Sequence, residues 1–137
     1  MFFKENKKED EDKNFVKIAS LLIHAAKIDE NFSKTEEKII TEALLKLGAK
    51  NESLESIIKA GKLMEENANQ ILDFTREVKN MDENKKIQII ETLWQIIYSN
   101  KEADIYETNL MRRLAGLLYV DNKTMGDIKE KIKKENS

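Results

Sequence analysis

The sequence has no cysteine, no proline and a single histidine, and each absence removes a class of chemistry. Without cysteine there is no disulfide and no thiolate for zinc, iron–sulfur clusters or covalent catalysis, which fits a reducing compartment. One imidazole, His24, cannot build a histidine-rich zinc site. The four glycines are isolated, so the chain has no glycine-rich phosphate loop. Few helix breakers remain, which favours an all-helical protein.

The chain also lacks a basic excess and a long apolar run. Its net charge is −2 although 36% of its residues are charged, so both signs are mixed along the chain. Phosphate binding by nucleic-acid proteins needs a basic excess, and acidic residues dilute the lysines near the C-terminus. No apolar stretch reaches the roughly 18 to 20 residues of a membrane-spanning helix, and the charges after Phe3 do not suit a signal peptide. We therefore expect a cytoplasmic protein without nucleic-acid binding or membrane insertion.

A charged segment near the N-terminus suggests the domain organisation. Nine of the ten residues from Lys4 to Lys13 are charged, and none of the ten can contribute apolar surface to a core. Such a segment gains too little on burial to offset its ordering entropy. We predict a flexible charged tail over residues 1–12 and one helical domain over residues 13–137.

Hydrophobic periodicity and capping residues predict about seven helices in that domain. Ser33 with Glu36 and Asp104 with Glu107 have the spacing of capping boxes, Asn67 and Asp82 also read as helix starts, and Gly48 reads as a helix end. The first segment runs from about Phe15 to Ile28, the second from Ser33 to near Gly48, and the fifth from Asp82 through Tyr98. The fourth starts after Asn67 and the sixth after Asp104. The third is marked by Leu54, Ile57 and Ile58, and the seventh by Met125, Ile128 and Ile132. The third and fourth are expected to cover the others.

The first and fifth segments are apolar almost all round, which is typical of helices at the centre of a bundle. The first leaves only one narrow polar stripe, which we expect to face water, and the fifth leaves another. The stripes are Lys17, Ser20, His24 and Lys27 in the first segment, and Gln88, Glu91, Thr92 and Gln95 in the fifth.

The two central segments and the helices after them also suggest an internal repeat. An offset of 71 residues aligns apolar positions, both capping boxes and most of the polar stripe. The pairs are Leu22 with Leu93, Ser33 with Asp104, Glu36 with Glu107, Ile39 with Leu110, Ile40 with Met111, Ala43 with Leu114 and Leu47 with Leu118. This alignment favours two pseudo-repeated helix pairs around two central apolar helices, although any two amphipathic helix pairs can be aligned in part.

The loop after each central helix concentrates oxygen ligands. Asp29, Asn31 and Ser33 have the spacing of the first three EF-hand ligands, which suits Ca²⁺ or Mg²⁺. The EF-hand comparison fails further on, because Lys34 replaces the obligatory glycine and Ile40 replaces the bidentate glutamate. The same residue types are also explained by helix capping alone.

Around these loops the chain resembles the tellurite-resistance TerB family, which also occurs as the N-terminal domain of a membrane-anchored J-domain co-chaperone. The second copy carries most of the resemblance, in Leu93-Trp94, Tyr106-Glu107, Arg112-Arg113 and the ending Leu117-Leu118-Tyr119-Val120. The first copy contributes Ala25-Ala26, Asp29, Ser33 and Glu36. The second copy departs from the family at Asn100 and Lys101, and the first at Glu30.

The resemblance implies a TerB-like helical bundle in stress or envelope-associated systems, with acidic residues that bind a divalent cation. The implied metal ligands are Asp29, Glu36, Asp104 and Glu107. A non-enzymatic binding or adaptor module, with Ca²⁺ or Mg²⁺ as the implied cofactor, is the first hypothesis. The second is a metal-free interaction domain for a protein partner, for example a membrane-associated one. The third, an enzyme that uses carboxylates as acid and base, rests only on acidic abundance.

Overall fold

The structure, a computed structural model, describes residues 2–27, 33–68, 72–99 and 105–135. Within these ranges the chain forms seven α-helices, one short 3-10 turn and no strand, as the all-helical prediction requires. The elements are α1 (Phe2–Ala26), α2 (Lys34–Lys46), the turn η2 (Asn51–Ser53), α3 (Leu54–Asn67), α4 (Leu72–Lys79), α5 (Glu83–Tyr98), α6 (Ile105–Leu117) and α7 (Asn122–Glu135). None of the described helices is both long and apolar enough to cross a membrane.

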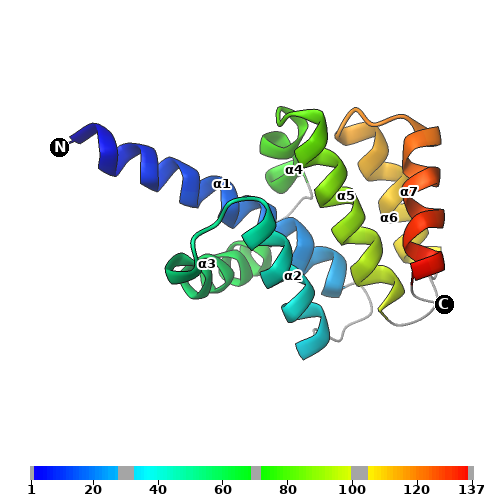
Figure 1. Ribbon diagram of the computed structural model, residues 1–137, viewed down its shortest axis with the longest axis horizontal. Coiled ribbons are helices and arrows are strands. Elements are labelled where there is room, and N and C mark those ends of the chain that lie inside the picture. Colours follow the sequence, from blue (N-terminus) through cyan, green and yellow to red (C-terminus); the bar gives the residue numbers. More distant parts are fainter. Residues whose placement is uncertain (1, 28–32, 69–71, 100–104, 136–137) are drawn as a thin grey trace.

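Helices α1 and α5 supply more buried apolar residues than any other helix, as their apolar sequences predict. α1 contacts α2, α3, α4 and α5, and α5 contacts α1, α2 and α7 (Figure 1). Leu22 of α1 and Leu93 of α5 are both completely buried. The helices predicted as covers, α3 and α4, both pack against α1. Two central helices wrapped by amphipathic partners therefore define the architecture.

The C-terminal end of α2 is closed by a Schellman motif around Gly48. The Ala49 amide donates to the Leu44 carbonyl at 2.9 Å, and the Gly48 amide donates to the Leu45 carbonyl at 3.1 Å. Gly48 has a φ of 110°, which a residue without Cβ adopts without strain. The predicted role of Gly48 as a helix end is confirmed.

Helix α6 ends in the same motif at positions offset by 71 residues. The Val120 amide donates to the Ala115 carbonyl at 3.0 Å, and the Tyr119 amide donates to the Gly116 carbonyl at 3.4 Å. Tyr119 takes the place of Gly48 and has a φ of 58°. The left-handed conformation costs roughly 1–2 kcal/mol for a residue with a Cβ. The conformation of Tyr119 at the end of α6 is therefore less favourable than that of Gly48 at the end of α2. The internal repeat as a whole stays a prediction, but its two helix ends have one geometry.

Two predicted helix boundaries are wrong. Asn67 does not begin a helix, because it is the last residue of α3, and α4 begins only at Leu72. The first helix begins at Phe2 rather than near Phe15, and its N-terminal turns extend away from the other helices in Figure 1. Lysine and glutamate are good helix formers, and opposite charges four residues apart support a helix without an apolar stripe. The charged segment lacks the apolar surface for a core but not the propensity for a helix.

The boundary of the domain at residue 13 stays a prediction that truncation can test. Deleting residues 1–12 should change the melting temperature by less than about 3 °C, because this segment adds little apolar burial. Thermal unfolding followed by circular dichroism at 222 nm measures the change. Deleting residues 1–18 is the control, since it also removes Ile18, which is 1% exposed, and should lower the melting temperature clearly. A fall of similar size in both truncations would contradict the boundary.

The polar stripe of α1 faces water only in part, because Lys17, His24 and Lys27 are half-buried and Ser20 is not exposed at all. Ser20 is completely buried, and its hydroxyl donates to the carbonyls of Val16 at 2.8 Å and Gly61 at 3.1 Å. One turn on, His24 and Lys27 both pair with Glu65 of α3, at 3.3 Å and 2.9 Å. Small and polar side chains on α1 therefore allow α3 to pack close to it.

Candidate functional site

The start of α2 is a capping box built by Ser33 and Glu36. The Ser33 hydroxyl accepts from the Glu36 amide at 3.1 Å, and the Ser33 amide donates to the Glu36 Oε1 at 2.9 Å. Glu36 is only 2% exposed, so its carboxylate lies buried at the positive end of the helix dipole. The predicted capping box is confirmed in both of its hydrogen bonds.

Glu107 occupies the corresponding place in α6. It is the third residue of α6, as Glu36 is the third residue of α2, and it is 4% exposed. Buried carboxylates are uncommon because desolvation of the charge is costly without polar partners. Two of them at equivalent positions of two helix starts make this pair the most unusual polar feature of the described residues.

The other two predicted ligands, Asp29 and Asp104, lie outside the described residues. Of the four predicted residues, the structure therefore places only Glu36 and Glu107. Within the described part of the chain, no group of three or more histidine, cysteine, aspartate or glutamate side chains is arranged to hold a metal ion.

Tyr98, at the end of α5, reports the electrostatics near Glu107. Burial raises the pKa of its phenol, and the negative charges of Glu130 and Glu107 raise this pKa further. Both carboxylates therefore act on the hydroxyl at the end of α5.

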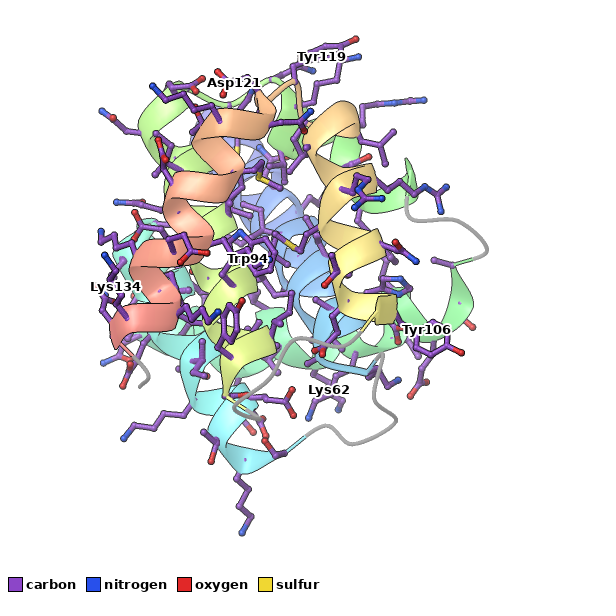
Figure 2. The ribbon with its side chains drawn as sticks, turned by 90° about the vertical axis from the view of Figure 1, so that its right-hand side faces the viewer. Lys62, Trp94, Tyr106, Tyr119, Asp121 and Lys134 are labelled. Atoms are coloured by element: carbon purple, nitrogen blue, oxygen red, sulfur yellow. The ribbon has the colours of Figure 1, made fainter. Side chains whose placement is uncertain are left out.

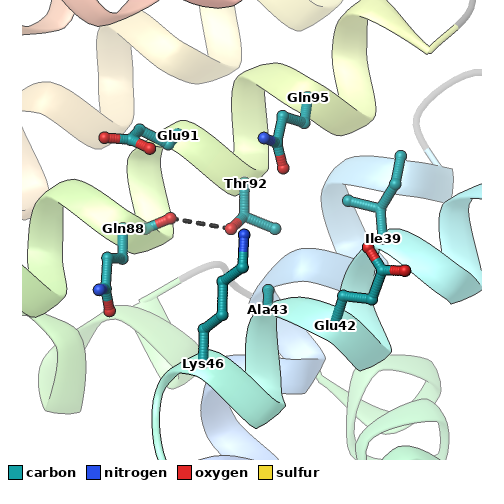
Figure 3. Close-up of a pocket in the computed structure, with 8 residues that line it drawn as sticks. All are labelled: Ile39, Glu42, Ala43, Lys46, Gln88, Glu91, Thr92 and Gln95. Atoms are coloured by element: carbon teal, nitrogen blue, oxygen red, sulfur yellow. Dashed lines mark hydrogen bonds between the residues drawn. The ribbon is translucent and has the colours of Figure 1, made fainter.

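The polar stripe of α5 lines a groove against α2 rather than an open surface (Figure 3). One part of the groove, about 100 Å³, lies between Lys46 and Glu42 of α2 and Glu91 of α5. A larger part, about 450 Å³, shares Glu42 and extends to Tyr98 and Glu135. Carboxylates, amides and one lysine line it, so it can hydrogen-bond polar molecules. It contains no histidine, cysteine or serine–base pair that would activate a nucleophile.

The burial of one charged residue, Lys86, was not predicted from the sequence. This lysine is 7% exposed, and its Nζ donates to the Leu118 carbonyl at 3.0 Å. Its ammonium therefore satisfies a carbonyl at the C-terminal end of α6, where the helix dipole favours a cation. Its burial could have been predicted from helical spacing. Lys86 lies three residues before Ile89 and four before Ile90, so it shares their apolar face. A lysine there needs a polar partner from elsewhere in the chain.

The fold is an all-helical bundle around two central helices, with a buried glutamate in the first turn of α2 and another in the first turn of α6, here called the acidic helix starts. Residues 15–130 match the family model described as tellurite resistance protein TerB. The match covers most of the chain, which therefore belongs to the TerB family. Comparisons with curated proteins and with solved structures gave no match.

Proposed function

We propose that the chain is a non-enzymatic, cytoplasmic binding module of a stress or envelope-associated system that binds Ca²⁺ or Mg²⁺ at its acidic helix starts. The observation that carries the proposal is the burial of Glu36 and Glu107 at equivalent positions, 2% and 4% exposed. Membership of the TerB family supports a binding role, since that family is generally non-enzymatic.

The first helix start is the better cation site. The sequence there includes the carboxylates of Asp29, Glu36 and Glu37. In the second copy, Asn100 stands in the place of Asp29, and Lys101 adds an ammonium group. A dication is bound most strongly where anionic oxygens converge, and a neighbouring amine repels it. In the second copy, Asp104 and Glu107 are therefore expected to bind more weakly.

The capping box limits what Glu36 can contribute. Because its Oε1 accepts a hydrogen bond from the Ser33 amide, this carboxylate can supply only part of a coordination shell. Ca²⁺ takes about six to eight oxygens, so Asp29, Asn31 and water would complete it. A cation held this way would link the loop to α2 and stabilise both.

A titration of the whole chain with Ca²⁺, Mg²⁺ and Mn²⁺ tests this proposal. A hundredfold excess of cation over Kd should stabilise the fold by about 2.7 kcal/mol, a rise in melting temperature of roughly 10 °C. The amide NMR resonances of residues 29–37 should shift. Asp29→Asn should abolish both effects, whereas Asp127→Asn, the same charge change on exposed α7, should leave them intact.

The second copy provides a gain-of-function test. Combining Asn100→Asp with Lys101→Gly restores the carboxylate and removes the ammonium, and should strengthen cation binding at α6. Unchanged melting temperatures and unchanged resonances of residues 29–37 at millimolar cation would overturn the proposal.

Protein recognition is the second candidate function, and four exposed large side chains favour it. Leu63 on α3 is 61% exposed and Tyr106 on α6 is 71% exposed, with Leu45 and Tyr119 also exposed. Aromatic side chains in such positions are enriched at protein interfaces. A cation titration without effect would leave Glu36 and Glu107 as caps and make a protein partner, for example a membrane-associated one, the leading account.

A further inference from the structure

The larger part of the groove between α2 and α5 also reaches the end of α7. Its volume of about 450 Å³ lies within the roughly 300 to 1,000 Å³ that is usual for small-molecule sites. Helix α5 contacts both α2 and α7, so three helices supply the walls (Figure 1). The walls include Ile39 and Glu42 of α2, Gln95 and Tyr98 of α5, and Glu135 of α7. The space therefore suits a small molecule rather than a single ion.

Tyr98 brings a hydroxyl without a partner to this space. The residue is 6% exposed, and its ring stacks, with centroids 5.9 Å apart, on that of Trp94, which Figure 2 shows between α6 and α7. The hydroxyl makes no hydrogen bond with another described residue. It is nevertheless accessible, because the Trp94 indole nitrogen is the only unpaired side-chain atom in the described part of the chain that is fully enclosed. A ligand in the groove can therefore pair with the Tyr98 oxygen.

The larger part of the groove has two charged residues, and both are acidic. They are Glu42 of α2 and Glu135 of α7. Neither carboxylate forms an ion pair or a hydrogen bond with another residue that the structure describes. Two unpaired carboxylates on different walls attract a positively charged molecule, and the attraction is reinforced when that molecule carries two charges.

Two lysines lie at the smaller part of the groove and leave the larger part negative. Lys46 lines the smaller part, and Figure 3 shows its side chain directed toward Thr92. Lys131 of α7 pairs with Glu91 at 3.7 Å. Both ammonium groups repel a cationic ligand from the smaller part. The larger part is therefore the place for a cation.

An organic cation fits these groups better than a metal ion does. Within the described ranges, no group of three or more histidine, cysteine, aspartate or glutamate side chains is arranged to hold a metal. Ile39, in contrast, is partly buried against the core and offers apolar surface to a hydrocarbon chain. Carboxylates on two walls with an apolar side chain in the lining match a molecule with an ammonium at each end of a short methylene chain.

We propose that the larger part of the groove binds a short linear diamine. One ammonium pairs with Glu42 and the other with Glu135, and the methylene chain lies against Ile39. The Tyr98 hydroxyl oxygen and the Gln95 amide oxygen accept hydrogen bonds from the ammonium groups. None of these residues is among the predicted metal ligands, so the test is independent of the cation titration.

Cadaverine, the diamine with a five-carbon chain, is the first probe, and the side-chain amide of Gln95 reports on it directly. Titrating the whole chain with cadaverine should shift the NMR resonances of this amide in a saturable way. Pentylamine, which has the same chain and one ammonium, should bind about two- to fivefold more weakly. Sodium chloride at equal ionic strength should give no saturable shift. Added salt should weaken cadaverine binding, because exposed charges are screened.

Glutamate substitutions separate this site from the rest of the surface. Glu42→Gln and Glu135→Gln should each weaken cadaverine binding about two- to fivefold, and the double variant about tenfold. Glu55→Gln combined with Glu66→Gln is the matched control, because it removes two exposed carboxylates of α3 that do not line the groove. All four glutamates are exposed, so every variant should fold.

Tyr98→Phe tests the hydroxyl alone. The variant keeps the ring on Trp94 and should weaken cadaverine binding at least about twofold. Its urea midpoint should not fall, since the hydroxyl has no partner among the described residues. The proposal is overturned if cadaverine gives no saturable shift of the Gln95 amide, or if the double variant of Glu42 and Glu135 binds it as the control does. Equal binding of cadaverine and pentylamine would overturn the pairing of two ammonium groups.

Discussion

Leu22→Ala and Leu93→Ala should each lower the free energy of unfolding by about 2 to 5 kcal/mol. Both side chains are completely buried, one in each central helix. Truncation to alanine removes apolar burial and leaves a cavity that densely packed neighbours cannot fill. Because single domains are stable by only about 5 to 15 kcal/mol, each variant should show a large fall in its urea midpoint.

Leu63→Ala is the matched control for these two substitutions. The same atoms are removed from α3, but Leu63 is 61% exposed, so the free energy of unfolding should change by less than about 0.5 kcal/mol. If Leu22→Ala costs no more than Leu63→Ala, α1 is not a central helix. If Leu93→Ala costs no more than Leu63→Ala, α5 is not a central helix.

Gly61→Leu should lower the free energy of unfolding by about 3 kcal/mol, the upper end of the range for overpacked cores. A Cβ at Gly61 would lie 2.9 Å from the Ala19 Cβ and 3.4 Å from the Ser20 backbone nitrogen. The obstacle includes helix backbone, so α3 must move away from α1. That movement would also break the hydrogen bond from the Ser20 hydroxyl to the Gly61 carbonyl.

Chemical denaturation of three variants tests the close approach of α1 and α3. Gly116→Leu has open space around its Cβ and should stabilise the chain by up to about 1 kcal/mol through helix propensity. Combining Gly61→Leu with Ala19→Gly should recover part of the loss, because the two positions are in contact. Equal stability of Gly61→Leu and Gly116→Leu would show that the helices are not in tight contact at Gly61.

Features that depend on neighbouring residues were predictable. Ser33 and Glu36 are three residues apart and meet whenever a helix starts between them, and Asp82 likewise accepts from the Lys85 amide at 2.9 Å. The failure at Asn67 shows the limit of this reasoning. An asparagine can cap a helix or continue one, and here Asn67 is the last residue of α3 instead of the cap of α4.

The candidate site was predictable only in part. Spacing predicted Glu36 and Glu107 as capping-box residues, and the TerB resemblance implied them as metal ligands, but neither reveals that both are buried. Trp94 was expected in the core, where it lies, yet the groove at the end of the same helix has walls from α2, α5 and α7. No pattern within one helix predicts a space that three helices line.

The sequence by itself determined the all-helical class, most helix ends and the two central helices. These depend on hydrogen bonds between near neighbours and on the period of apolar residues, both of which are local. Only the tertiary structure decided that Ser20 and His24 face α3, since their partners Gly61 and Glu65 are 41 residues away. The tertiary structure also decided that Lys86 is buried, because the Leu118 carbonyl that accepts its hydrogen bond is 32 residues away. Whether a polar side chain meets water or another helix depends on how helices pack, and their periodicity does not specify that packing.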